Sequence, residues 1–586
     1  MYLVLLETAA NQKYIFTTNK LKENIGASEL TYRSGTKWLL EAIGEITASS
    51  AITVWGDSQR LRRTLLDPTH NPNNIEVPSS TTRFEIIVAA SGKALVLTKQ
   101  ETDAQSLIQQ VTHKALDKAP GLEITGLYLP FDWEKDLLGE VNAQLHKQYE
   151  KVRSSKPSAA MRFSRLPIVA ACQNSGLPAA DLQFNPDGGR PIPLSQMSIS
   201  KQAVSIKGRE RVERLLSINK SDYGFAADTN ELEAIKQIDW LAIVHADGNG
   251  LGQIFQNFHH HIDATSPADN RKFVDKLRRF SIGLDICTEQ AFLSALDQLP
   301  TYKSNRKDKP ELIPLTPLIL GGDDLTVVCD GRSALPFTAK FLEAFEAATA
   351  ASHPEVGSIV SEVAQAALRC DRLSACAGVA IVKLHFPFSV AYSLAEQLMS
   401  SAKEVKLEVT HAKTGAPLPC SALDFHIVYD SSDVSFSAIR DKLKTYPDEE
   451  RETVLYKRPY VVTEPEKLST ARGKEWASFH RWQTLLEAIQ VVTAKDEDGR
   501  AQLPNSQIHD LRVALYQGQS VADARYRLIR DRYQSANIVT LAGSQDSLFQ
   551  LEPLRNQQPA AKKQRQMTVL LDALDASEFM GQASSA

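Results

Sequence analysis

Carboxylate side chains occur in two short, glycine-rich motifs of this 586-residue sequence. Asp247 ends the apolar run DWLAIVHAD, just before the turn GNGLG, and Asp323 and Asp324 complete the motif GGDD further along the chain. If both turns lie at one edge of an antiparallel sheet, the carboxylates repel one another unless a hard divalent cation neutralises them. We therefore expect the three aspartates to bind Mg²⁺ (or Mn²⁺), which can activate an attacking hydroxyl and stabilise a leaving oxygen. Either motif alone is also typical of an ordinary turn, but the pair on matching elements favours a site.

The glycines after Asp247 indicate phosphate binding. Gly248, Gly250 and Gly252 let backbone N–H groups approach a triphosphate at the start of the next helix. The spacing is not that of a dinucleotide-binding fingerprint, because the third glycine comes one residue early. An EF-hand loop is excluded as well, since its fifth and twelfth positions would be Leu251 and Phe258. The sequence has no Walker A, GxSxG or HExxH motif, which removes the P-loop and those hydrolase classes.

The elements that must position these motifs can be predicted from hydrophobic patterning. Residues 2–6 and 84–97 are apolar, β-branched runs, and the second is broken at Ser91-Gly92 as in a hairpin. From Asp239 onward the pattern predicts a strand, two helices, a hairpin, a helix, a strand, a helix and a strand. The chain is therefore predicted to contain an α/β domain, a connecting domain, a second α/β domain and a helical domain, at residues 1–130, 131–235, 236–430 and 431–586.

The composition is that of an ordinary globular protein, with 43% hydrophobic and 23% charged residues, which excludes a disordered, collagen-like or coiled-coil chain. A formal charge of −4 provides no global basic field for nucleic acid. No apolar run reaches the roughly 18 to 20 residues that cross a bilayer, and no secretory signal is seen, so we expect a cytoplasmic protein without a membrane partner. The six cysteines form no CxxC pair, which indicates reduced thiols rather than disulfides.

Several segments together resemble a known family. HADGNGLGQIF, GGDD, AGVAIVKLHFPF, AEQLMSSAKEVK and LDFHIV resemble the catalytic palm of the large, polymerase-like subunit of type III CRISPR effector complexes, a family related to GGDEF nucleotide cyclases. QKYIFTTNKLKENIGAS resembles its first palm, and LPNSQIHDLRVAL its helical C-terminal part. The resemblance implies an α+β fold with two ferredoxin-like palm domains, a helical connector and a helical C-terminal domain.

The resemblance also implies an activity. The chain would convert ATP into cyclic oligoadenylate with release of pyrophosphate, as part of an RNA-guided antiviral complex. Its partners would be the other subunits of the guide-RNA complex, including a small helical subunit, and target RNA through that complex. Asp247, Asp323 and Asp324 would bind the metal ions and be catalytic. The nucleotide would lie against Gly248, Asn249, Gly250, Gly321, Gly322 and Lys403.

An internal alignment compares the two predicted palms. Matching KYIF with GQIF places Thr8 at the position of Asp247, and matching ALVL with LTVV places Ala90-Ser91-Gly92-Lys93 over GGDD. Both carboxylate positions are then empty in the first palm. We therefore expect the first palm to be non-catalytic and the chain to have a single catalytic centre.

Other features of the family are not matched. Many members begin with an HD-type nuclease domain, whereas this sequence starts at a palm strand, so no DNA cleavage is expected; His509-Asp510 is typical of a helix surface. The segment CQNSGLPAA around Cys172 resembles the remains of the zinc site that the family often carries, with its partner cysteines missing, so zinc is not expected. The cluster His259-His260-His261 with Asp263 could bind a metal but is more typical of a solvated face.

Two other functions fit the same residues. The chain could be chiefly a scaffold that contacts the guide-RNA complex, in which case the aspartates would not be needed for assembly. It could also be a stand-alone, GGDEF-like cyclase that makes a cyclic dinucleotide.

Overall fold

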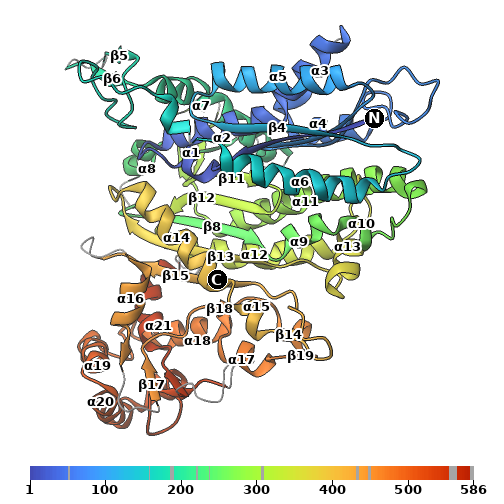
Figure 1. Ribbon diagram of the computed structural model, residues 1–586. Coiled ribbons are helices and arrows are strands. Elements are labelled where there is room, and N and C mark those ends of the chain that lie inside the picture. Colours follow the sequence, from blue (N-terminus) through green and yellow to red (C-terminus); the bar gives the residue numbers. More distant parts are fainter. Residues whose placement is uncertain are drawn as a thin grey trace.

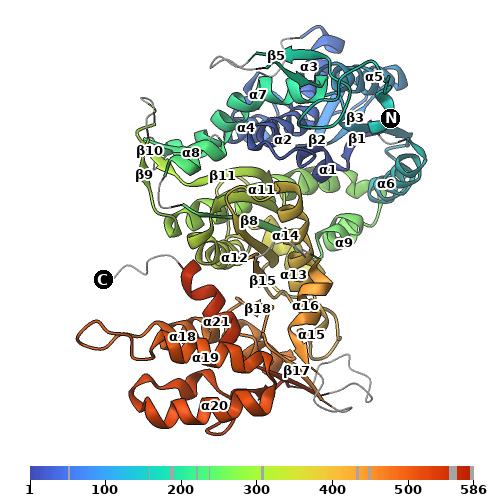
Figure 2. The ribbon, with the colours of Figure 1, turned by 90° about the vertical axis from the view of Figure 1, so that its left-hand side faces the viewer.

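The chain forms three parts stacked one on another, seen in a computed structural model as an N-terminal part around one sheet, a middle part around a second sheet, and a C-terminal part (Figures 1 and 2). No described helix is long and apolar enough to span a membrane. The predicted domain boundaries at 236 and at 430–431 fall on residues outside the described ranges. The structure describes residues 1–49, 53–157, 159–184, 190–218, 222–226, 228–235, 238–304, 306, 309–429, 435–445, 451–553 and 564–580.

The first sheet has four antiparallel strands in the spatial order β2-β3-β1-β4. Its strands are β1 (Tyr2–Ala9), β2 (Phe84–Ala90), β3 (Lys93–Thr98) and β4 (Glu123–Pro130). The central strand β1 is buried on both faces, which explains its continuous apolar run. The helices around this sheet are α1 (Asn11–Ile15), α2 (Leu21–Gly35), α3 (Lys37–Thr47), α4 (Ser58–Leu66), α5 (Glu101–Lys118) and α6 (Leu138–Ser155).

The second sheet has six strands in the order β11-β12-β8-β13-β15-β18. They are β8 (Trp240–Gly248), β11 (Leu315–Gly321), β12 (Asp324–Asp330), β13 (Ala375–Lys383), β15 (Ala422–Ile427) and β18 (Tyr460–Val461). The predicted strands, hairpin and long helices of this region are confirmed. The helices are α9 (Leu251–Gln256), α10 (Phe258–His261), α11 (Asn270–Ala295), α12 (Ala334–Ala350), α13 (Ile359–Leu368), α14 (Phe388–Ala402) and α15 (Val405–Glu408).

The two sheets repeat one topology. Each begins with its central strand, continues through helix to a hairpin, and returns through helix to a fourth strand beside the first, so that β1, β2, β3 and β4 correspond to β8, β11, β12 and β13. Both hairpins are irregular at matching positions, between Ile86 and Val88 and between Pro317 and Ile319. Helix α6 packs on β1 and β4 as α14 packs on β8 and β13. The internal repeat inferred from the sequence is therefore present in the backbone.

The pairing register corrects the alignment of the two sheets by one residue. Lys93 pairs with Glu7 across β3 and β1. In the second sheet Leu325 pairs with Ala246, and continuing that register sets Asp324 beside Asp247. Glu7, and not Thr8, therefore corresponds to Asp247, and the expectation that both carboxylate positions are empty in the first sheet is wrong. A short apolar match such as KYIF with GQIF cannot fix the register of a strand that precedes it.

The connecting segment contributes helices and short strands between the two sheets. Its elements after α6 are β5 (Asp181–Gln183), β6 (Ile192–Leu194), α7 (Gln196–Glu213), β7 (Tyr223–Phe225) and α8 (Thr229–Ala234), and β7 pairs with β10 (Glu311–Ile313), which in turn pairs with β9 (Tyr302–Lys303). Helix α7 packs tightly on α2. A Cβ at Gly26 would lie 1.8 Å from the carbonyl oxygen of Lys201, so the two helices can approach only because residue 26 is glycine.

The sequence predicts a helical C-terminal domain, but the C-terminal part also contains strands. A four-stranded sheet of order β16-β17-β21-β20 accompanies its helices, and β18 joins the second sheet. These strands are only two to four residues long, and β17 and β21 pair in parallel from distant parts of the chain, so no local pattern marks them. The elements are α16 (Phe436–Lys442), β16 (Lys444–Thr445), β17 (Arg451–Val454), α17 (Lys474–Phe479), α18 (Trp482–Thr493), α19 (Asn505–Tyr516), α20 (Gln519–Arg532), β20 (Gln550–Leu551), β21 (Gln564–Met567) and α21 (Leu570–Ala576).

Gly378 allows α14 to lie directly on the second sheet. A Cβ at this position of β13 would lie 2.0 Å from the carbonyl oxygen of Ala395 and 2.3 Å from the amide nitrogen of Met399. We predict that Gly378→Ala lowers the free energy of unfolding by about 1 to 3 kcal/mol, because α14 must move away from the strand. Denaturant unfolding of the full chain measures this change. The matched control is Gly252→Ala, where a Cβ meets no atom within 4 Å; an equal loss in both variants would contradict the prediction.

Candidate metal and nucleotide site

Three carboxylates meet at one edge of the second sheet. Asp247 stands near the end of β8, and Asp323 and Asp324 lie at the turn of the β11–β12 hairpin. One ligand oxygen from each lies within 4.8 Å of the others. A Cβ at Gly248 would lie 2.7 Å from a carboxylate oxygen of Asp323, so glycine is needed there for the hairpin to close over β8. The structure therefore brings together the three residues that the sequence had singled out.

Burial makes this cluster electrostatically costly. It raises the pKa of Asp323 to about 7, with the neighbouring Asp247 as the next cause. It also raises the pKa of Asp324 well above its usual range, helped by both other carboxylates. For Asp247, burial favours a higher pKa, but the hydrogen bond with Asp324 and the charge of Lys403 outweigh it and lower the pKa. Lys403, which follows α14, forms an ion pair with Asp247.

The donor set fits a hard divalent cation. Mg²⁺ and Mn²⁺ prefer carboxylate oxygens, and Mg²⁺ commonly takes only a few of them together with substrate phosphates. The three aspartates supply such oxygens from two different turns, and a divalent charge would remove the repulsion that raises two of their pKa values. A lysine alone supplies a single positive charge to the three carboxylates.

Helix α11 fixes the hairpin that carries Asp323 and Asp324. The Gly322 amide donates to Asp285 Oδ1 at 2.5 Å, and Thr288 Oγ1 donates to the Gly322 carbonyl at 2.5 Å. Burial raises the pKa of Asp285 to about 6. Sequence reasoning missed both residues. Their spacing of three along α11 was the available signal, because it places two polar side chains on one face of the helix.

Asn249 holds the turn after β8 rather than pointing to the metal side. Its Nδ2 donates to Ser374 Oγ at 2.9 Å and to the Cys420 carbonyl at 3.2 Å, and its amide nitrogen donates to the Ser374 carbonyl. Gly250 follows in the left-handed region with φ +78°, which favours glycine. Gly250 and Gly252 are exposed, so their backbone remains accessible to a ligand.

The corresponding place in the first sheet holds a charge pair instead of a carboxylate cluster. Lys93 Nζ lies 3.2 Å from Glu7 Oε2 and 3.0 Å from His146 Nε2. Lys93 takes the position of Asp324 and Gly92 that of Asp323, so one carboxylate remains and its counter-charge is a side chain. This arrangement does not fit a divalent metal.

A second polar cluster surrounds Cys172, where a zinc site was considered. Ser175 Oγ lies 2.9 Å from Ser195 Oγ, which is 3.4 Å from Ser198 Oγ, and that hydroxyl is 3.6 Å from the Cys172 sulfur. Burial alone would raise the pKa of Cys172, but hydrogen bonds from these serines lower it to about 6. One thiol and three hydroxyls do not fit zinc, which in structural sites takes thiolate or imidazole ligands.

The remaining histidine motifs form no metal site within the described residues. His259 is buried, and its ring lies tilted against the ring of His260, with ring centroids 4.0 Å apart. The three aspartates above form the metal-ligand group found in the part of the chain that the structure describes, and the histidine cluster does not join it. His509 is exposed on α19, and Asp510 forms an ion pair with Arg525 at 3.3 Å.

A comparison with protein families gives an independent identification of this region. Residues 240–408 match the family described as Cas10/Cmr2, second palm domain. This segment contains β8, the GGDD hairpin, α14 and Lys403. This match confirms the resemblance of these segments to the palm of the large subunit of type III CRISPR complexes. No curated protein matches the chain.

The chain is also similar to several solved structures. One is titled "Crystal structure of Csm1-Csm4 cassette in complex with pppApApA", at 11% identity and a TM-score of 0.38, covering 71% of this chain and 55% of that chain. A second is the Csm1-Csm4 cassette with cA3, at 13% identity and a TM-score of 0.46, covering 99% and 70%. A third is a type III-B Cmr-beta cryo-EM structure in the apo state, at 10% identity and a TM-score of 0.47, covering 91% and 77%. The chain thus spans about half the length of the first of these.

The raised pKa values predict a pH-dependent loss of stability without metal. Asp323 in the folded protein binds its proton more tightly than an unfolded aspartate of pKa about 3.9, so its favourable contribution is present below pH 4 and is lost as the pH rises to about 7. In EDTA at pH 8, the free energy of unfolding of the Asp323→Asn variant should therefore be about 1 to 3 kcal/mol higher than that of the unaltered chain. Excess Mg²⁺ should stabilise the unaltered chain at pH 8 more than the variant. Equal behaviour of both proteins with and without Mg²⁺ would contradict this.

From the geometry of the serine cluster around Cys172 we predict that cysteine substitutions can create a zinc site. A tetrahedral site with Zn–S bonds of about 2.3 Å has sulfur–sulfur distances of about 3.8 Å, near those between the present side-chain atoms. We expect Ser175→Cys/Ser195→Cys/Ser198→Cys to bind one zinc ion per chain, measured as metal content and as the absorption of the Co²⁺ form. Adding Cys172→Ser to that variant should weaken binding. Failure of the triple variant to retain zinc would show that the backbone around Cys172 does not hold four sulfur atoms in a tetrahedral arrangement.

Proposed function

We propose that this chain converts ATP into cyclic oligoadenylate, with release of pyrophosphate, as the large subunit of a type III CRISPR RNA-guided antiviral complex. The proposal is carried by the clustering of Asp247, Asp323 and Asp324 on a Cas10/Cmr2 second palm domain. Lys403 beside them supports it, since a cation next to the carboxylates is suited to a phosphate ligand.

In the proposed reaction a 3′ hydroxyl oxygen attacks an α-phosphorus, the new phosphodiester bond forms and the bond to pyrophosphate breaks. Asp247, Asp323 and Asp324 would hold Mg²⁺ or Mn²⁺. When bound, these ions promote loss of the hydroxyl proton and neutralise phosphate charge. Lys403 Nζ, 3.4 Å from the Gly248 carbonyl, is near enough to the turn to contact the triphosphate.

The backbone of both glycine turns would bind the nucleotide. Gly248, Asn249 and Gly250 on one side, and Gly321 and Gly322 on the other, flank the carboxylates. Asn249 would act on the nucleotide indirectly, by fixing the turn through Ser374. Backbone N–H groups are suited to this task because they bind phosphate without adding a net charge.

The first sheet would serve as a non-catalytic palm that holds a second nucleotide. Two small cavities, of about 120 and 40 Å³, separate the hairpin tips of the two sheets, and Ser91 and Gly321 line both. Asp324 lines the larger cavity together with Gln12 and Arg211. A nucleotide entering from this side would meet both hairpins, and the Glu7–Lys93 pair leaves only one set of metal ligands.

The proposed partners are subunits of a guide-RNA complex, including a small helical subunit, with target RNA reaching the chain through that complex. The weakly negative net charge of −4 supports contact with RNA mainly through partner proteins.

The activity is tested by incubating the full chain, alone and within its complex with target RNA, with ATP and Mg²⁺, and identifying products by mass spectrometry. We expect cyclic oligoadenylate. Asp323→Ala/Asp324→Ala should reduce the amount of product at least about 100-fold. Substitution of residues that only hydrogen-bond to metal ligands already lowers metal affinity or activity about 10- to 100-fold. The control is Asp239→Ala/Asp371→Ala, which removes two exposed carboxylates away from the cluster.

Other outcomes of this experiment would indicate a different function. Assembly of the complex without any product, or product that is undiminished in the double variant, would refute the proposed site and favour a scaffold. A cyclic dinucleotide made by the chain alone would favour a stand-alone cyclase.

A further inference from the structure

A cavity of about 690 Å³ lies on the other side of the turn that follows Asp247. Its walls come from α9, the end of α13, α15 and the loop between β14 (Thr410–His411) and β15. Asn249 and Gly250 form part of the wall, but no carboxylate of the metal cluster lines it, and neither does Lys403. The cavity therefore lies at the same sheet edge as the cluster, displaced from β8 toward β13 and β15.

The charge of this cavity is of one sign. Arg369, Lys406, His261 and His411 line it, and its lining contains no aspartate or glutamate. Arg369 and Lys406 are exposed and form no ion pair with any described residue. Arg369 ends α13 in the left-handed region with φ +53°, a conformation that a non-glycine residue adopts at some cost and that is concentrated at functional sites. Unpaired cations around one hollow favour an anionic ligand.

Apolar side chains make up much of the remaining wall. Ile254, Leu368, Leu407 and Leu418 line the cavity, and Leu407 is 40% exposed although it is a large hydrophobic residue. A volume between about 300 and 1,000 Å³, an apolar wall and a few polar groups are typical of sites for small organic ligands. Together with the cations, this lining suits a molecule with a phosphate at one end and an apolar ring at the other.

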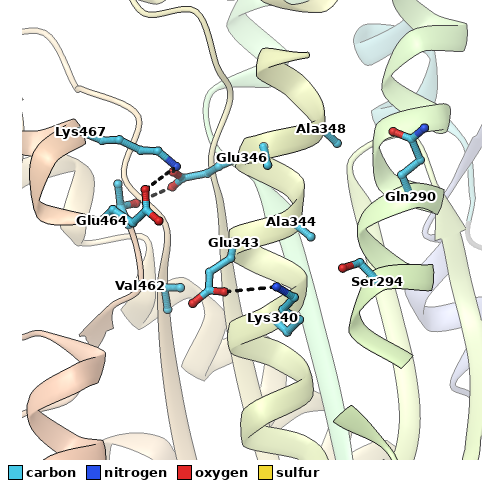
Figure 3. A pocket seen from close by; sticks show the side chains of 12 residues that line it. Gln290, Ser294, Lys340, Glu343, Ala344, Glu346, Ala348, Val462, Glu464 and Lys467 are labelled. Carbon is cyan, nitrogen blue, oxygen red and sulfur yellow. Dashed lines mark hydrogen bonds and ion pairs between the residues drawn. The ribbon is translucent and has the colours of Figure 1, made fainter. Parts of the chain in front are cut away.

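A second cavity, of about 460 Å³, differs from the first in how its charged side chains are paired (Figure 3). It lies between α11, α12 and residues 462–467, and its charged side chains pair with one another. Lys340 lies 3.9 Å from Glu343, and Lys467 lies 3.7 Å from Glu346, as the dashed lines in Figure 3 indicate. Its cations are thus already neutralised, and it offers no comparable field for an anion.

We propose that the 690 Å³ cavity binds a nucleotide anion, with its phosphates at Arg369 and Lys406 and its base against Leu407 and Leu418. Binding there requires neither the aspartates nor a metal ion, so the proposal does not depend on the proposed catalytic function. Asn249 connects the cavity to the metal cluster, because it fixes the turn after Asp247 through Ser374 and Cys420, which also line the cavity.

Phosphates could reach these cations in two ways, as a separate nucleotide or as the triphosphate of a nucleotide bound at the metal cluster. ADP binding, measured by isothermal titration calorimetry in EDTA on full-length Asp323→Ala/Asp324→Ala protein, separates them. We expect one equivalent of ADP to bind. Adding Arg369→Asn/Lys406→Gln should weaken binding at least about tenfold, since charge-assisted hydrogen bonds are lost. Asparagine is chosen at 369 because it tolerates the left-handed conformation.

The matched control is Arg279→Gln/Lys340→Gln in the same background, which removes one arginine and one lysine outside this cavity and should change ADP affinity less than about twofold. Lys406→Gln alone, at an exposed position, gives a second variant whose fold is not at risk. Absence of ADP binding without metal, binding that appears only with intact aspartates and Mg²⁺, or undiminished affinity in the Arg369 and Lys406 variants would overturn the proposal.

Discussion

Mutual repulsion among three half-buried carboxylates is the constraint on which the middle part of this protein depends. Asp247, Asp323 and Asp324 are held close enough to share a ligand, and burial raises two of their pKa values. The hairpin that carries two of them would relax away from β8 if nothing opposed the repulsion. Asp285 and Thr288 oppose it by forming hydrogen bonds with the backbone N–H and the carbonyl oxygen of Gly322. The long helix α11 thus stabilises a geometry that is costly without a cation and favourable with one.

The first sheet, which has the same topology, balances the charge at this position in a different way. Lys93 in the first hairpin supplies the positive charge that a metal would supply in the second, and Glu7 is its partner. In the second sheet the lysine follows the helix instead, at Lys403 beside Asp247. The two halves therefore share a topology but differ in where the cation is placed. A difference of a few side chains on one backbone plan separates an edge whose carboxylates fit a metal ion from one whose carboxylate is paired with a lysine.

The predictable parts of the fold were those specified by local sequence. The strand before Asp247, the GGDD hairpin and the helices α11, α12 and α14 follow from apolar runs and helical periodicity, which burial in a sheet and helix layer imposes. The parts that escaped prediction depend on distant segments. The small C-terminal sheet pairs β17 with β21 across more than a hundred residues, and the one-residue offset between Thr8 and Glu7 depends on strand register.

The amino-acid sequence was enough to predict the chemistry of the candidate site, because glycine and aspartate occur there in two contiguous motifs whose residue types suit metal and phosphate ligands. Tertiary structure alone decided which atoms meet. It turned the amide of Asn249 away from the carboxylates to hold the turn, set Lys403 against Asp247, and enclosed Arg369 and Lys406 in one cavity. The physical reason is that side-chain direction and strand pairing are fixed by packing between segments far apart in the chain, which no local pattern encodes.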